Sequence, residues 1–410
     1  MKPCFRRTDI YIPNESVDLS KWSVVACDQY TSEPEYWNKV KNLVDDSPST
    51  FNIIFPEVYL NENYSRVDKI HNMMNQYLKD KIITEKVKQG FVLTERDTVS
   101  GKRIGLVGVV DLEQYTFISE PDKKIRATED TIISRIPPRV KIREGASIES
   151  THVMLLIDDP DKKLIENIYD NRESFNKIYD FELMMNGGHI KGYAIDGEKA
   201  IAVENAIFNI QTKSNGLFLA VGDGNHSLAT AKACWENLKK NLSSEQLEAH
   251  PSRYALVELV NLHSPALIFE PIHRVIFNTD QDHLIERFVF YLQEHEYEFT
   301  DGKEIVFIQN SKRKGFDISN KKHHLPVDIL QCFLDDYLEK HKNTDIDYIH
   351  GEEVVNELTK GKNNCGILLN KINKNLLFDS IVAGGSLPRK TFSLGEAFEK
   401  RYYLECRKIL

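Results

Sequence analysis

A carboxylate, an amide, an imidazole and a hydroxyl stand within one short turn of the sequence: Asp223, Asn225, His226 and Ser227. Such side chains can move protons, bind a cation or donate hydrogen bonds to an anion. Where a carboxylate lies at a phosphate site, a divalent cation usually bridges the carboxylate and the phosphate, or the carboxylate acts as a proton acceptor. We therefore predict that Asp223 and His226 are catalytic and that Asp223 also ligates a metal.

The residues on either side of the turn Gly222–Ser227 indicate how it is positioned. The apolar run Leu217–Val221 predicts a buried strand, and the apolar spacing in Leu228–Lys240 predicts a helix. The first N–H groups of a helix lack intrahelical acceptors, and the helix dipole favours an anion there. Glycines allow a positive φ and a close approach to phosphate. We predict that four residues of the turn bind phosphate: Gly222, Gly224, Asn225 and Ser227. The alternative is that the turn only caps the helix.

A second group of charged residues lies between positions 126 and 143. Arg139 and Arg143 are four residues apart, which places like charges side by side on a helix, so an anionic partner would explain them better. We predict that both bind phosphate, that Arg126 binds substrate, and that Glu129 accepts a proton from a substrate hydroxyl. The alternative is a solvated charge run without a ligand.

Asp28 and Tyr30 follow a predicted strand at Trp22–Ala26. Ligand sites often gather at the ends of strands, so we predict that both residues bind substrate. The alternative is that they serve only the turn before the next helix.

Alternating strand-like and helix-like segments predict a mixed α/β or α+β protein. The other predicted strands are Phe51–Leu60, Ile104–Leu112, Val153–Ile157, Tyr254–Leu262, Glu304–Gln309 and Gly366–Leu369. The other predicted helices are Arg66–Lys79, Lys163–Ile178, Asp282–His295, Val327–Lys340 and Leu394–Lys408. We place a domain boundary after residue 278, which gives an α/β region at 1–278 and an α+β region at 279–410.

Several blocks of the sequence resemble domain of unknown function family 1015. The turn at Asp223–Ser227 is similar to the family's Asp-Gly-His-His-Arg signature, which also occurs in free serine kinases of the ParB/sulfiredoxin-like superfamily. The other matching blocks stand in the family's order: Val24–Tyr30, Phe51–Pro56, Ile125–Thr131, Ile136–Ile157, Tyr254–Arg274 and Leu387–Phe392. The resemblance therefore spans nearly the whole chain.

The resemblance implies a ParB/sulfiredoxin-like core around the strand, turn and helix. It also implies that Lys390 binds phosphate and that the last ~25 residues return to the site. In the serine kinases that the signature resembles, a glutamate is the base. Asn225 and Ser227 depart from the signature's first histidine and its arginine. Because arginine is a strong phosphate ligand, either Arg139, Arg143 or Lys390 replaces it or the ligand differs.

Composition limits the classes of function. The chain of 410 residues carries 53 basic and 62 acidic side chains, a net charge of −9. That balance argues against nucleic-acid binding, which needs a basic face. No apolar stretch approaches the ~20 residues of a membrane span, and no apolar segment of a secretory signal follows the basic start. The six cysteines lack a CxxC pair, which is typical of reduced thiols. We expect a cytoplasmic protein.

These observations lead to one principal hypothesis and two alternatives. The principal hypothesis is a phosphotransferase that uses ATP or ADP with Mg²⁺ and acts on a small hydroxyl-bearing metabolite. By analogy with the serine kinases, that metabolite could be an amino acid such as serine. The alternatives are a nucleotide-binding regulator of the ParB-like type and a hydrolase of a phosphorylated metabolite. The expected partners are a nucleotide and a small molecule, and a homo-oligomer is left open.

Overall fold

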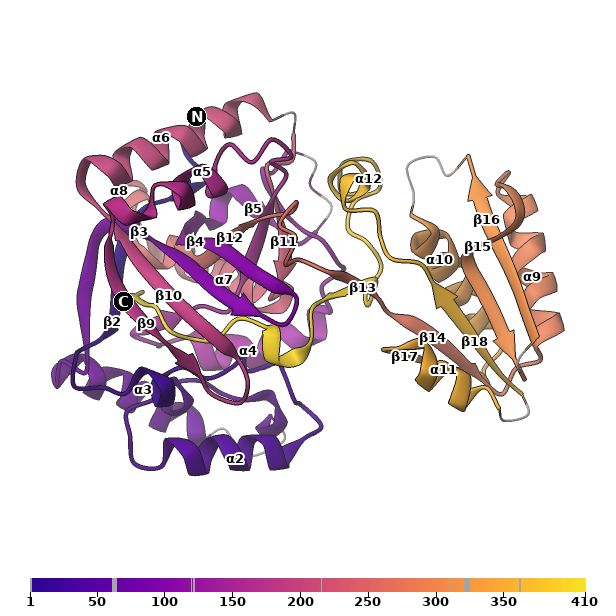
Figure 1. The fold of residues 1–410 in the computed structure, drawn as a ribbon, viewed down its shortest axis with the longest axis horizontal. Coiled ribbons are helices and arrows are strands. Elements are labelled where there is room, and N and C mark those ends of the chain that lie inside the picture. The colour runs from indigo at the N-terminus through magenta and orange to yellow at the C-terminus, as the bar shows by residue number, and fades with distance from the viewer. Residues whose placement is uncertain are drawn as a thin grey trace. The chain divides into compact units, whose positions relative to one another are not determined.

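The computed structural model describes residues 2–60, 65–118, 120, 122–214, 216–310, 312–320, 325–360 and 363–410. The chain forms two compact units (Figure 1). The first unit comprises Met1–Ile268 together with Gly395–Leu410, and the second comprises Phe269–Leu394. Among the described helices, none combines the length and the apolar character that crossing a membrane requires.

The strands of the first unit form one mixed sheet. Its main path runs through β5 (Tyr115–Thr116), β6 (Ile125–Ala127), β11 (Leu219–Asp223), β8 (Met154–Ile157), β12 (Tyr254–Asn261), β4 (Gly101–Asp111), β3 (Ile83–Thr98), β2 (Thr8–Pro13), β20 (Cys406–Lys408) and β7 (Ile148–Ser150). β1 (Phe5–Arg6) also pairs with β4, and β10 (Gly188–Ile195) lies between β3 and β9 (Asn176–Leu183). β11 is parallel to β6 and antiparallel to β8, so the sheet mixes both pairings at the predicted site.

Two apolar cores lie on opposite faces of this sheet. On β4, Val107 and Val109 belong to one core, whereas Leu106 and Val110 belong to the other, as the two-residue period of a strand requires. The helices packed on the first core are α2 (Pro34–Val44) and α3 (Ser65–Lys79); those on the second are α6 (Gly197–Lys213) and α7 (Asn225–Leu238). Shorter helices are α1 (Leu19–Trp22), α4 (Ile136–Arg143), α5 (Ile165–Asp170) and α8 (Ser244–Ala249). The predicted mixed α/β class is confirmed.

Four predicted elements of this unit are wrong. Phe51–Leu60 forms two 3₁₀ turns instead of a strand. The predicted strand Trp22–Ala26 is also wrong, because Val25 makes only an isolated bridge, to Tyr402. Lys163–Ile178 contains the short α5 and a 3₁₀ turn at Arg172–Ser174 before β9 begins. Leu394–Lys408 forms a 3₁₀ turn at Ala397–Glu399 and ends in β20, because tertiary contacts override its helical pattern. Residues 399–407 of that segment are all buried, which leaves no solvent face for a surface helix.

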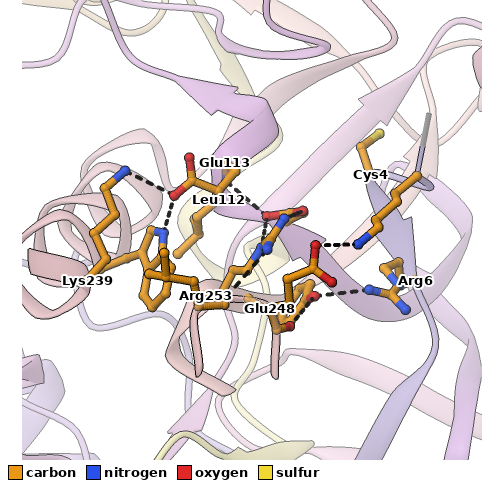
Figure 2. A network of polar contacts seen from close by, with 12 residues as sticks. Cys4, Arg6, Leu112, Glu113, Lys239, Glu248 and Arg253 are labelled. Atoms are coloured by element: carbon orange, nitrogen blue, oxygen red, sulfur yellow. Dashed lines mark hydrogen bonds and ion pairs between the residues drawn. The ribbon is translucent and has the colours of Figure 1, made fainter. Parts of the chain in front are cut away.

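Polar contacts fix the far end of α7, the helix that follows the predicted phosphate-binding turn. Figure 2 shows Glu113, whose Oε1 accepts from the indole Nε1 of Trp235 at 2.6 Å and from Lys239 Nζ at 3.0 Å. Nearby, Asp111 accepts two hydrogen bonds from the Arg253 guanidinium, at 2.9 and 2.6 Å. These contacts bind the C-terminal end of α7 to the residues that follow β4. Because a helix is rigid along its axis, they also help to position its N-terminus.

The second unit contains an antiparallel sheet in the order β16 (Lys312–Ser319), β15 (Glu298–Gln309), β18 (Asn364–Leu369), β14 (His273–Phe277) and β17 (Asp345–Ile349). Its helices are α9 (Gln281–Glu294), α10 (Pro326–Lys340), α11 (Glu352–Leu358) and α12 (Leu377–Gly384). Where the chain enters and leaves the unit, β13 (Phe269–Pro271) pairs with β19 (Phe392–Leu394). Beyond that pair, the Gly395 N–H donates to the Ile268 carbonyl at 3.4 Å. The unit is thus an insertion whose two connections lie side by side.

Candidate functional site

The turn between β11 and α7 has the geometry that its glycines predict. β11 ends at Asp223, and α7 begins at Asn225. Between them, Gly224 adopts the left-handed conformation with φ of 82°. A Cβ on Gly224 would lie 3.1 Å from Val153, and one on Gly222 would lie 2.9 Å from Leu156. Both glycines therefore let the turn pack closely against β8 and the residue before it.

Replacing Gly224 with alanine is expected to lower the free energy of unfolding by about 1–3 kcal/mol, since a left-handed residue with a Cβ is strained. The matched control is Gly197→Ala at the start of α6, where φ is also positive at 54° but nothing lies within 4 Å of the added carbon. Chemical denaturation of both variants separates backbone strain from crowding against Val153. Equal losses in the two variants would mean that this crowding contributes nothing.

Lys400 reaches the turn from the C-terminal segment of the first unit. Its Nζ lies 3.4 Å from Asp223 Oδ2, and its side chain is only 10% exposed. The other oxygen of Asp223 accepts from the Gly224 N–H at 3.0 Å. A mostly buried ammonium group therefore stands beside the start of α7, where it adds positive charge to the helix dipole.

His152 connects Ser227 to the same C-terminal segment. Its Nε2 lies 3.0 Å from the Ser227 hydroxyl, and its Nδ1 lies 2.7 Å from the Tyr403 hydroxyl. The Tyr403 oxygen also accepts from the Cys27 N–H at 3.3 Å. Burial raises the pKa of Tyr403 well above its ordinary value, so this phenol stays protonated. A hydroxyl, an imidazole and a phenol thus form one chain of polar contacts.

Asp28 lies within the electrostatic reach of His152 and Lys400. Burial disfavours its charged form, but His152, a hydrogen bond from Gln29 at 3.0 Å, and Lys400 together hold the pKa of Asp28 below its ordinary value. Asp28 is therefore a carboxylate at neutral pH. The nearby Glu57 behaves in the opposite way, because its pKa is raised by burial and also by the charge of Asp28, although Arg139 opposes the shift.

The two predicted phosphate-binding arginines of α4 are already paired with carboxylates. Arg139 forms an ion pair with Glu57 and donates to it from Nε at 3.0 Å. Arg143 lies 2.5 Å from Glu149, which Arg407 also contacts at 2.7 Å. Intramolecular carboxylates therefore neutralise the like charges that suggested an anionic ligand. Their assignment as phosphate ligands stays a prediction, and it would require both pairs to open.

The loop after β6 lies against the predicted turn. The Thr128 hydroxyl donates to the Val221 carbonyl at 2.6 Å, and the Ile132 N–H donates to His226 Nε2 at 3.3 Å. Glu129, which is half-buried, lies between these two contacts in the sequence. His226 Nε2 thus accepts a hydrogen bond from this loop. The proximity is consistent with the predicted roles of Glu129 and His226 and leaves both as predictions.

The remaining predicted residues are spread more widely. Arg126 is buried on β6, beside β11, and its Nε donates to the Lys123 carbonyl at 3.3 Å. Tyr30 stacks on Tyr36 with ring centroids 3.6 Å apart. Lys390 belongs to the second unit and has a positive φ of 60°. Their assignments to substrate and phosphate stay predictions.

Asp223 was also predicted as a metal ligand, and its surroundings bear on that role. No group of three or more histidine, cysteine or acidic side chains within the described ranges could hold a metal ion. The Asp223 carboxylate is engaged by the Gly224 N–H and by Lys400. These contacts fit a carboxylate neutralised by lysine better than one that holds a resident cation.

Comparison with known proteins identifies the family. The model of the family described as protein of unknown function (DUF1015) matches residues 9–345. The chain is a DUF1015 protein. No curated protein matches its sequence.

Solved structures similar to this DUF1015 protein share little sequence with it. A free serine kinase in complex with AMP is 10% identical, covers 72% of this chain and 90% of its own, and has a TM-score of 0.38. SbnI with a C-terminal truncation from Staphylococcus aureus is 9% identical, with coverage of 70% and 82% and a TM-score of 0.36. A conserved hypothetical protein from Pyrococcus furiosus is 11% identical, with coverage of 72% and 90% and a TM-score of 0.34. These similarities assign no ligand to this chain.

Four side chains near the turn were not predicted as site residues: Glu57, His152, Lys400 and Tyr403. Two of them lie in Leu394–Lys408, where the helical pattern gave no reason to expect a return to the sheet and only the family resemblance implied one. Glu57 lies in the segment predicted as a strand. His152 stands alone between two short strands, β7 and β8, and an isolated histidine carries no motif. The missing arginine at Ser227 pointed to a basic residue from elsewhere, but the replacements named for it were Arg139, Arg143 and Lys390, and Lys400 was not among them.

Proposed function

We propose that this DUF1015 protein is a nucleotide-dependent phosphotransferase that acts on a small hydroxyl-bearing metabolite. The observation that carries the proposal is the position of Lys400, 3.4 Å from Asp223 at the start of α7. Lysine is a common phosphate ligand that acts as a point charge. Lys400 therefore supplies the positive charge that the signature arginine would have supplied at Ser227.

The chain's own residues account for the main requirements of phosphoryl transfer, which are positioning and charge stabilisation. The N–H groups at the start of α7 and the Lys400 ammonium would bind the phosphates of ATP or ADP. Asp28, ionised beside His152 and Lys400, would accept the proton of the attacking hydroxyl. His226 and Glu129, at the edge of the turn, are the further candidates for proton transfer.

Magnesium would arrive with the nucleotide in this proposal. Mg²⁺ usually keeps several waters and binds through substrate phosphates and one or two carboxylates. Asp223 could join such a cation only after its contact with Lys400 loosened. The dependence of nucleotide binding on Mg²⁺ is therefore an informative measurement in its own right.

Thermal unfolding with ATP, ADP or CTP, each with and without Mg²⁺, tests the proposal. A nucleotide at 100 times its dissociation constant is expected to raise Tm by roughly 5–11 °C. At the same nucleotide concentration the shift should fall to about half or less in Lys400→Met, because a charge-assisted contact is worth about 1.5–3 kcal/mol. It should also fall in Asp223→Asn.

The matched control is Lys390→Met, which tests whether the lysine of the second unit has the role proposed for Lys400. A shift lost in Lys390→Met but kept in Lys400→Met would reassign the phosphate ligand. The absence of any shift in the unmodified protein at millimolar nucleotide would overturn the proposal. A shift without turnover would instead favour the nucleotide-binding regulator.

A hydrolase of a phosphorylated metabolite is the second candidate, and one arrangement favours it. A nucleophile and base within about 2.6–3.2 Å, with the base oriented by a third group, is the signature of an activated nucleophile. Ser227 would be the nucleophile, with its hydroxyl 3.0 Å from Nε2 of His152, the base. The Tyr403 hydroxyl, 2.7 Å from His152 Nδ1, would orient that base. This candidate predicts release of phosphate from p-nitrophenyl phosphate without nucleotide, abolished in Ser227→Ala. The phosphotransferase predicts no such release.

A further inference from the structure

An apolar cavity of about 160 Å³ opens beside the polar chain of Ser227, His152 and Tyr403, within the first unit. Its apolar wall comes from α3, α4, α7, β7, β12 and the 3₁₀ turns after Ser49. The lining side chains that matter below are Ile54, Met74, Ile148, Ala231 and Leu256, all of which are less than a tenth exposed. The polar chain lines the same cavity, so a molecule in it would present one end to Ser227.

The charged residues around the cavity are neutralised within the protein. Arg139 is paired with Glu57, and Arg143 is paired with Glu149. A ligand group in the cavity therefore meets no net charge, and a carboxylate or phosphate there would have to compete with these pairs.

The lining hydroxyls are also engaged inside the protein. The Thr230 hydroxyl donates to the His226 carbonyl at 2.7 Å, and the Thr151 hydroxyl accepts from the Val153 N–H at 3.0 Å. A strongly polar group in the apolar part would lose its water without gaining equivalent partners. The lining therefore favours a hydrocarbon group.

The volume sets the size of that group. An engineered cavity of about 150 Å³ lined by aliphatic and aromatic side chains binds benzene. A cavity of about 160 Å³ thus accommodates an aliphatic or aromatic group of about six or seven non-hydrogen atoms. The single side-chain carbon of serine would leave most of it unfilled.

We infer that the hydroxyl-bearing substrate carries an apolar group of about this size, which the cavity binds while the hydroxyl lies at Ser227 and His152. The inference rests on the proposed function for the role of the hydroxyl, and it narrows the acceptor to a class more apolar than serine. Binding of the apolar group itself does not depend on nucleotide.

The test measures binding of simple alcohols to the full chain without nucleotide, by thermal unfolding and ligand-observed NMR. The probes are ethanol, 1-butanol, 1-hexanol, 1-octanol and benzyl alcohol, with free serine and glycerol as polar controls. Affinity is expected to rise about fourfold for each added methylene. The rise should stop near six or seven non-hydrogen atoms, and the polar controls should not bind.

Two leucine variants locate the binding. Ala231→Leu adds three carbons to the cavity wall and should abolish binding of 1-hexanol and benzyl alcohol. Ala202→Leu, on the exposed face of α6, adds the same carbons elsewhere and should leave binding unchanged. Should Ala231→Leu fail to fold, Ala146→Leu fills the same cavity from the segment after α4.

The inference would be overturned if affinity did not depend on chain length, if serine bound as tightly as 1-hexanol, or if the filling variants left 1-hexanol binding unchanged. Competition between adenosine and benzyl alcohol would also overturn it, because it would show that the cavity binds the base of the nucleotide and not the apolar group of the substrate. Nucleotide-induced shifts measured on the same samples show separately whether the proposed function stands. Loss of the nucleotide shift with alcohol binding intact would remove the proposed function alone.

Discussion

Arg401→Met is expected to lower the free energy of unfolding of the first unit by about 3–5 kcal/mol, the cost of leaving a buried charge without its partner. Arg401 Nε lies 3.1 Å from Glu258, and the same guanidinium pairs with Glu405. All three side chains are no more than 3% exposed. The arginine also lowers the pKa of Glu258 against the effect of burial. Without it, the pKa of this carboxyl should rise.

Tryptophan fluorescence is the appropriate measurement, because all three tryptophans, Trp22, Trp37 and Trp235, are buried in the first unit. Urea denaturation followed by this signal reports on that unit and not on the second. The control Lys163→Met removes an exposed ion pair with Asp161, which water and salt screen, and should leave the free energy of unfolding almost unchanged. A similar small loss in Arg401→Met would show that the buried charges are not interdependent.

Under the proposed phosphotransferase activity, Asp28 is the general base, so Asp28→Asn is expected to reduce turnover of ATP by about 10²–10⁴-fold while nucleotide affinity is retained. Asp28 is ionised because His152 and Lys400 hold its pKa below the ordinary value in spite of burial. Activity should accordingly be level through neutral pH and fall only in acid, once this carboxylate is protonated. The measurement is release of ADP from ATP in the presence of a pool of hydroxyl-bearing metabolites.

Glu129→Gln is the control for this experiment, since Glu129 was the base expected from the sequence. A large loss in Glu129→Gln and a small one in Asp28→Asn would show that Glu129, and not Asp28, is the general base.

Asp28 also affects how the stability of the protein depends on pH. A carboxyl whose pKa is depressed on folding stabilises the protein above its unfolded pKa, and this contribution is lost as pH falls through the folded pKa. Asp28→Asn should therefore weaken the dependence of stability on acid pH.

The sequence anticipated the centre of the site better than its surroundings. β11, the turn and α7 were predictable because an apolar run, two glycines and a helical apolar face follow one another locally. Predicted strands such as Ile104–Leu112 and Tyr254–Leu262 also correspond to β4 and β12, whose long apolar runs are unambiguous. Each of these signals is contained within a few neighbouring residues.

The family resemblance implied that the C-terminal segment returns to the site, but the individual contacts were not predictable because they join distant segments. Lys400 meets Asp223 and Tyr403 meets His152 only because the C-terminal segment pairs with β2 and β7 through β20. Arg139 and Arg143 illustrate the converse problem. Their spacing on α4 suggested an external anion, whereas the structure supplies internal carboxylates from residues 57 and 149.

The inserted second unit sets the order in which the ribosome completes the site. Asp28, His152 and Ser227 emerge before Phe269–Leu394, whereas Lys400 and Tyr403 emerge after it. At about 5–20 residues per second, translation of the insertion takes roughly 6–25 s. Throughout that interval the nascent first unit carries the carboxylates of its site without their lysine. The side chains of the candidate site are complete only when the last segment takes its place between β2 and β7.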